Sequence, residues 1–144
     1  MPITVPTGDC SFCAYLAGDR PYTVLRQDDV TATLVTREQR GLGHVLVIPV
    51  AHRETILDVT SDEAAALGAA VSDAAQAVSR SYDPTGISVW QNNGVGNSQS
   101  VPHVHFHVAG TLPDGEGDAR TGTLWGPVPR LSVAETDTIA DRLR

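Results

Sequence analysis

The chain has 144 residues, a formal net charge of −7 and an ordinary hydrophobic share of 41%. This length is enough for one domain with its own core. The acidic balance argues against a nucleic-acid surface and against binding to an acidic membrane, but it does not exclude nucleotides. No stretch approaches the roughly 20 apolar residues of a membrane span, and the start lacks a signal pattern. We therefore expect a soluble, cytoplasmic, single-domain protein.

The first half of the chain predicts one short helix and then strands. Asp9 is expected to cap the helix and Gly18 to end it. The run that ends at Pro49 is almost continuously apolar, which is typical of a strand buried on both faces. The strands expected in this half cover residues 22–26, 30–35 and 44–48.

The second half predicts two helices and two strands. Thr60 and Glu63 form a capping box at the start of a helix over residues 60–80, and Ser132 and Glu135 form another before a C-terminal helix over 131–144. The apolar stripe of the first helix consists of Leu67, Val71, Ala75 and Val78. The two strands are expected at residues 87–92 and 103–108, and they should pair antiparallel. Together the elements predict an α+β domain over residues 1–144, with an antiparallel sheet of five or six strands. Its core covers about 9–110, and a loop and the last helix fill 111–144.

Three of the five histidines alternate with apolar residues between His103 and Val108. A period of two places His103, His105 and His107 on one face of a strand, and the Val-Phe-Val face requires a core. Such a face can be merely polar, can bind a metal ion, or can supply a nucleophilic imidazole. The spacing alone does not separate metal binding from catalysis.

The sequence His103-Val104-His105-Phe106-His107-Val108 resembles the His-x-His-x-His motif of the histidine triad family of nucleotide hydrolases and transferases. The Gly-rich run 92–98, the pair Gln99-Ser100, the segment 10–13 and the segment 43–49 resemble the same family in the same order. The resemblance covers about residues 9–110. It implies a dimer in which the sheet continues between two copies.

The resemblance also implies roles for single residues. His105 would be the nucleophile that attacks the α-phosphorus of a nucleotide, giving a nucleotidyl-histidine that water then hydrolyses. His107 and Ser100 would donate protons to the phosphate or the leaving group. The residues expected to bind substrate are His44, Asn92, Gln99, Thr36 and Phe12. Family members often have an acidic residue for the ribose where this chain has Thr36-Arg37, so Arg37 meets either a phosphate or solvent.

Cys10 and Cys13 form a Cys-x-x-Cys pair, which needs two more ligands to complete a tetrahedral zinc site. Many bacterial relatives complete it with a histidine after the third strand and with the first histidine of the triad, here His52 and His103. The resemblance thus implies a structural zinc. The alternatives are a catalytic metal on the three triad histidines and, less favoured, a redox pair.

The leading functional prediction is a hydrolase that cleaves at the α-phosphate of a purine nucleotide, as a nucleoside phosphoramidase. Gln99-Ser100 resembles the phosphoramidase branch, because a serine can protonate a leaving amine. Three alternatives stay open: a dinucleoside polyphosphate hydrolase, a nucleotide-binding module with little turnover, and a zinc-dependent hydrolase of other substrates.

Overall fold

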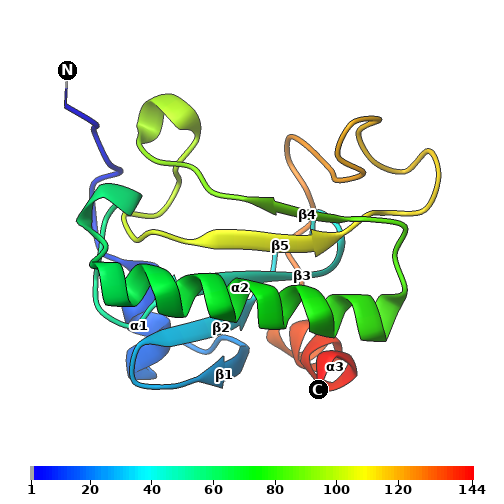
Figure 1. Ribbon diagram of the computed structural model, residues 1–144, viewed down its shortest axis with the longest axis horizontal. Coiled ribbons are helices and arrows are strands. Elements are labelled where there is room, and N and C mark those ends of the chain that lie inside the picture. The colour runs from blue at the N-terminus through cyan, green and yellow to red at the C-terminus, as the bar shows by residue number, and fades with distance from the viewer. Residues whose placement is uncertain (1) are drawn as a thin grey trace.

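The computed structural model describes residues 2–144, which form one five-stranded antiparallel sheet and three α-helices (Figure 1). The strands are β1 (Val24–Gln27), β2 (Thr31–Val35), β3 (Leu42–Pro49), β4 (Ile87–Trp90) and β5 (Phe106–Gly110). The helices are α1 (Ser11–Ala17), α2 (Ser61–Tyr82) and α3 (Val133–Leu143), with short 3-10 turns η1 (Ile56–Asp58) and η2 (Val95–Asn97). The strand order is β1-β2-β3-β5-β4. The predicted α+β class with an antiparallel sheet is confirmed.

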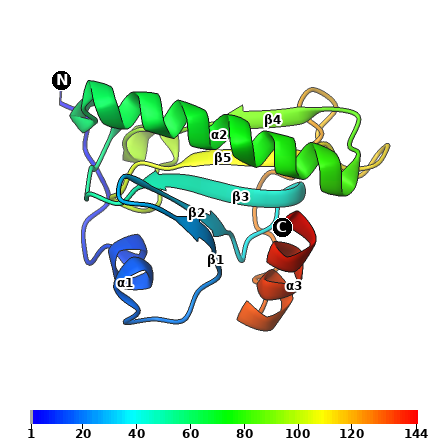
Figure 2. The same cartoon turned by 60° about the horizontal axis from the view of Figure 1, so that its bottom comes forward.

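Strand β3 lies in the middle of the sheet and is buried on both faces, as its apolar run predicts. Val45 and Val47 point to one face, where they join a core that includes Leu67 of α2. Leu46 and Ile48 point to the other face, where they pack with a second apolar cluster. Figure 2 shows α1 and α2 on opposite sides of the sheet. Each face of β3 therefore has its own helix.

The helix ends follow local hydrogen bonding. Both predicted capping boxes are present, at Thr60 before α2 and at Ser132 before α3. Gly18 ends α1 in the left-handed conformation at a φ of 79°, as expected. The predicted cap at Asp9 is wrong, because Cys10 occupies the N-cap and its Sγ accepts a hydrogen bond from the amide of Cys13 at 3.3 Å.

The histidine-rich strand is shorter than predicted. Its ladder begins at Phe106, which lies opposite Val47 of β3, so His103 and His105 precede the strand and Gly110 belongs to it. If the ladder with β3 continued two residues further, Val104 would pair with Pro49, which has no amide hydrogen to donate. The amide of Val104 instead donates to the carbonyl of Arg53 at 2.7 Å.

The C-terminal segment returns to the sheet. Helix α3 contacts α2 and β2, and its residues Ala140 and Leu143 are part of the core under α2. The extended stretch before α3 reaches the loop that follows β2, where the amide of Leu131 donates to the carbonyl of Arg37 at 2.8 Å. This contact places the end of the stretch beside the loop that links β2 to β3.

Candidate functional site

A pocket opens where α1, the end of β2, β3 and β5 meet, on the side of the sheet that α1 covers. We call it the histidine pocket. Of the residues predicted for the site, those that line it are Phe12, Thr36, His44, Ser100, His105 and His107. The structure therefore brings together most of the residues expected to act on substrate, from segments far apart in the sequence.

The His105 side chain is buried and held by a backbone carbonyl. Its Nδ1 lies 2.8 Å from the carbonyl oxygen of His103, which can only accept a hydrogen bond. Nδ1 must therefore carry the proton. Burial lowers the pKa of His105, opposed by this hydrogen bond, so the ring favours its neutral form. In that form Nε2 has a free lone pair, which is what a nucleophile requires.

His107 carries its proton on the opposite ring nitrogen from His105, and its hydrogen bond with His44 determines this tautomer. The amide of Arg40 donates to Nδ1 of His44 at 3.0 Å, so the proton of a neutral His44 must lie on Nε2. This Nε2 lies 3.0 Å from Nδ1 of His107 and donates to it. Burial, first among the causes, lowers the pKa of His44 to about 3 and that of His107 to about 2, so both rings are neutral. His107 consequently carries its proton on Nε2.

Trp90 fixes the plane of the His107 ring, a role that the sequence did not suggest. Trp90 of β4 lies directly opposite His107 of β5, and the two rings stack with centroids 4.6 Å apart and planes 4° apart. Phe12 plays a similar part on α1, where its edge contact with His105 has a centroid distance of 5.1 Å. Each of the two imidazoles is thus oriented by a hydrogen bond and by an aromatic neighbour.

Two predicted substrate residues do not line the histidine pocket, namely Asn92 and Gln99. The Gln99 side chain is buried and organises the loop before the triad. Its Oε1 accepts from the amide of Gly94 at 2.6 Å, and its Nε2 donates to the carbonyls of Glu54 and Val101. Its amide group is therefore occupied within the protein and positions the segment that leads to Ser100.

Several lining residues were missed, and they come from α1, from loops and from the C-terminal stretch. Tyr15 and Tyr22 stack with centroids 3.9 Å apart at one end of the pocket. Arg40 and Arg130 also line it, together with Arg37. No local sequence pattern indicates Arg130, because its position depends on how the stretch after residue 110 folds back on the sheet.

The four predicted zinc ligands lie together beside the pocket. The ligand atoms of Cys10, Cys13, His52 and His103 are all within 4.8 Å of one another. Three of the sulfur–nitrogen distances are 3.3, 3.4 and 3.6 Å. A zinc ion about 2.3 Å from sulfur and about 2.0–2.1 Å from nitrogen would put tetrahedral neighbours about 3.5 Å apart. The side chains therefore fit a tetrahedral ion.

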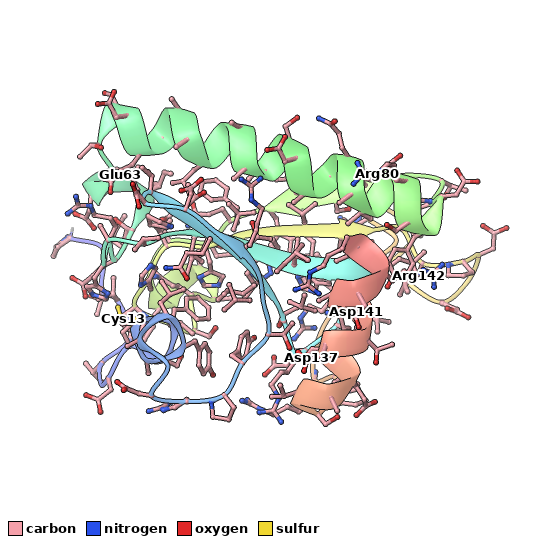
Figure 3. The ribbon with its side chains drawn as sticks, turned by 90° about the horizontal axis from the view of Figure 1, so that it is seen from below. Cys13, Glu63, Arg80, Asp137, Asp141 and Arg142 are labelled. Carbon is pink, nitrogen blue, oxygen red and sulfur yellow. The ribbon has the colours of Figure 1, made fainter. Side chains whose placement is uncertain are left out.

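His103 is oriented for this role by the strand end. Its Nε2 lies 2.8 Å from the carbonyl oxygen of Pro49, so Nε2 carries the proton and Nδ1 is free to bind a metal. Cys13, labelled in Figure 3, sits on α1 beneath the sheet. A metal at this cluster would tie α1 to the segment that precedes His105.

The fold and the site together define an α+β domain with a histidine-based centre on one face of its sheet. The family model described as the HIT domain matches residues 17–113. The chain belongs to the HIT family. Between residues 2 and 144, no helix has both the length and the apolar character required to span a membrane.

Relatives and solved structures agree with this assignment. Protein hit of Bacillus subtilis is 32% identical over 117 residues, which cover 81% of this chain and 79% of that protein. Adenosine 5'-monophosphoramidase hnt1 of Schizosaccharomyces pombe is 28% identical over 134 residues, with 93% and 95% covered. A crystal structure of a HIT family protein from Bacillus subtilis has a TM-score of 0.71 at 30% identity and covers 95% of this chain and 99% of its own. A Zn-bound histidine triad family protein from Mycobacterium smegmatis has the same fold, with a TM-score of 0.74, 22% identity and coverage of 93% and 92%.

Proposed function

We propose that the protein is a nucleotide hydrolase or transferase that cleaves a phosphorus–nitrogen bond at the α-phosphate, with His105 as nucleophile. One observation carries the proposal: the neutral rings of His105 and His107 lie with centroids 4.9 Å apart, and their Nε2 atoms differ in protonation. One nitrogen offers a lone pair and its neighbour offers a proton. The name of the fission-yeast relative, adenosine 5'-monophosphoramidase, supports the same chemistry.

In the first step, the Nε2 lone pair of His105 attacks the α-phosphorus and forms a nucleotidyl-histidine. The bond to the leaving amine breaks, and its electron pair leaves with the nitrogen. Ser100, which lines the pocket, or the Nε2 proton of His107 would protonate the departing group. The hydrogen bond to the carbonyl of His103 stabilises the charge that develops on the His105 ring.

In the second step, water attacks the phosphorus of the intermediate and gives its proton to the group that protonated the amine in the first step. The bond to His105 breaks, its electrons return to Nε2, and the nucleoside monophosphate leaves. Where Ser100 is the acid that protonates the amine, His107 would donate its Nε2 proton to a non-bridging oxygen in both steps. This donor requires the tautomer that His44 imposes.

We further propose that Cys10, Cys13, His52 and His103 hold a structural zinc ion. All four protein ligands are used, so the site would have no open position for catalysis. Bound zinc supplies a crosslink between α1 and the segment before His105. That crosslink would hold Phe12 against the His105 ring, where the structure places it.

The proposal is tested by steady-state turnover of adenosine 5'-phosphoramidate and of diadenosine triphosphate. We expect AMP from the phosphoramidate, and no turnover by His105→Ala despite an unchanged thermal unfolding transition. Preference for diadenosine triphosphate would instead favour the polyphosphate alternative with the same nucleophile. AMP binding without turnover of either substrate would make the protein a nucleotide-binding module and would refute the enzymatic proposal.

A further inference from the structure

The histidine pocket concentrates positive charge in an acidic protein. The chain has a net charge of −7, with 17 acidic residues and 10 basic ones. Arg37, Arg40 and Arg130 all line the pocket. Within residues 2–144, none of these three lies within 4 Å of a carboxylate, whereas other arginines do. The paired ones are Arg26, Arg53, Arg120 and Arg144.

Two of these arginines are held in place by backbone carbonyls of the C-terminal stretch. Nε of Arg37 donates to the carbonyl of Leu131 at 2.6 Å. Nη1 of Arg40 donates to the carbonyls of Leu124 and Gly126 at 3.2 and 2.7 Å. Carbonyls orient a guanidinium group but do not neutralise it, so both charges remain available to a ligand.

The three arginines neighbour two different groups of pocket residues. Arg40 lies in the loop before β3, where its amide donates to His44; beside burial, the main cause, its charge lowers the pKa of His44 and of His107. Arg37 lies beside the other group, which we call the Tyr22 end, where its amide is 3.4 Å from the hydroxyl of Tyr22. Burial raises the pKa of Tyr22, and the charge of Arg130 is among the weaker influences that oppose this rise, so Arg130 belongs to the Tyr22 end.

The three arginines supply more positive charge than a single phosphate requires. Of the three arginines, Arg40 is the one whose charge acts on His44 and His107, so a single reacting phosphate beside these rings would leave Arg37 and Arg130 without an anion. Guanidinium groups pair with phosphate through forked, charge-assisted hydrogen bonds, and an arginine is the residue that accommodates a phosphorylated ribose in dinucleotide sites. The exposed Glu38 is the pocket's one lining carboxylate among the described residues, and it is too far to pair with any of the three arginines.

We propose that the substrate carries a second phosphate, which Arg37 and Arg130 bind at the Tyr22 end while the reacting phosphate lies between His105, His107 and Arg40. The inference rests on the proposed function, because it assumes that a nucleotide phosphate occupies the histidine end. The second phosphate is on the ribose, because the leaving amine takes the place of a longer 5' chain on the α-phosphorus.

The test is calorimetric titration with AMP, ADP, adenosine 2',5'-bisphosphate and adenosine 3',5'-bisphosphate at one ionic strength. We expect at least one of the two ribose bisphosphates to bind about tenfold or more tightly than AMP, since a hydrogen bond to a charged group contributes about 1.5–3 kcal/mol. ADP is the control for added charge on the 5' chain, and tight binding of a ribose bisphosphate but not of ADP would place the second phosphate on the sugar.

Arg130→Gln is the discriminating variant, because Arg130 is exposed and its loss should not disturb folding. It should reduce the ratio of the AMP dissociation constant to that of the preferred bisphosphate towards one. The matched control is Arg80→Gln, an exposed arginine on α2 on the far side of the molecule (Figure 3). This control should leave the ratio unchanged.

Three outcomes overturn the inference. AMP that binds as tightly as every bisphosphate refutes the second phosphate site and leaves the proposed function intact. A preference that survives Arg130→Gln, or that Arg80→Gln also removes, refutes the assignment to the Tyr22 end. No binding of any nucleotide refutes the inference and the proposed function together.

Discussion

His44 and His107 share a hydrogen bond of 3.0 Å between Nε2 and Nδ1, and the backbone amide of Arg40 fixes its direction. His44 is 1% exposed, so it acts through His107. Replacement by Leu removes the donor and lets His107 hold its proton on Nδ1. We expect kcat to fall about 100-fold or more, the scale of a lost general acid.

His44→Gln is the matched control, because the glutamine amide can place an N–H near the position of the imidazole Nε2. It should retain much more activity than His44→Leu at equal thermal stability. Equal losses in both variants would show that His44 matters for packing alone and would contradict the proton assignment.

The buried His44 also predicts how stability depends on pH. Its pKa is about 3 in the folded protein, and an unfolded histidine titrates near 6.5. Above pH 6.5 neither state binds the proton. Between pH 6.5 and 3 only the unfolded state binds the proton. The free energy of unfolding therefore decreases as the pH decreases, by about 1.4 kcal/mol per pH unit for this residue.

Urea unfolding at pH 4.5, 5.5 and 6.5 measures this effect. The free energy of unfolding of His44→Gln should depend less steeply on pH than that of the wild type over this range. Both proteins have the same cysteines and the same His52 and His103, so the contribution of the metal cluster cancels in the comparison. Parallel curves would show that His44 does become protonated in the folded state.

The metal cluster predicts which variants lose zinc. Cys13→Ser removes one of four ligands, so the purified protein should contain far less zinc by mass spectrometry and should unfold at a lower temperature. His105→Ala and His107→Ala should keep their zinc, because neither residue belongs to the cluster. Loss of zinc in the His105 and His107 variants, with retention in Cys13→Ser, would place the metal on the triad.

The expected dimer involves an edge of the sheet, and β4 is an edge strand with Val89 half exposed. An unpaired edge strand can continue a sheet into a second copy. The wild type should therefore have the mass of a dimer in light scattering, and Val89→Glu should have that of a monomer. Val30→Glu, at a residue of 39% exposure in the turn between β1 and β2, should remain a dimer. A monomeric wild type would refute this expectation.

The parts of the fold that depend on local chemistry could be predicted from the sequence. The capping boxes at Thr60 and Ser132 and the buried strand that ends at Pro49 follow from neighbouring residues alone. The start of the histidine strand was misplaced, because it depends on Val104 lying opposite Pro49 of β3. Such register is a tertiary property.

The histidines and cysteines could be found by motif, but their surroundings could not. Trp90 stacks on His107 only because β4 and β5 pair in one register. Arg130 reaches the pocket through the path of the C-terminal stretch, which has no local pattern. Gln99 matches the family motif, yet its side chain holds the loop together.

The central claim is that Nε2 of His105 forms a covalent bond to the nucleotide. The most direct measurement is rapid acid-free quenching of a single turnover with adenosine 5'-phosphoramidate, followed by mass spectrometry of the intact protein and of its peptides. We expect a transient gain of one adenylyl group on the peptide that contains His105, absent in His105→Ala. An adenylyl group on another residue, or AMP formation by His105→Ala at the wild-type rate, would contradict it.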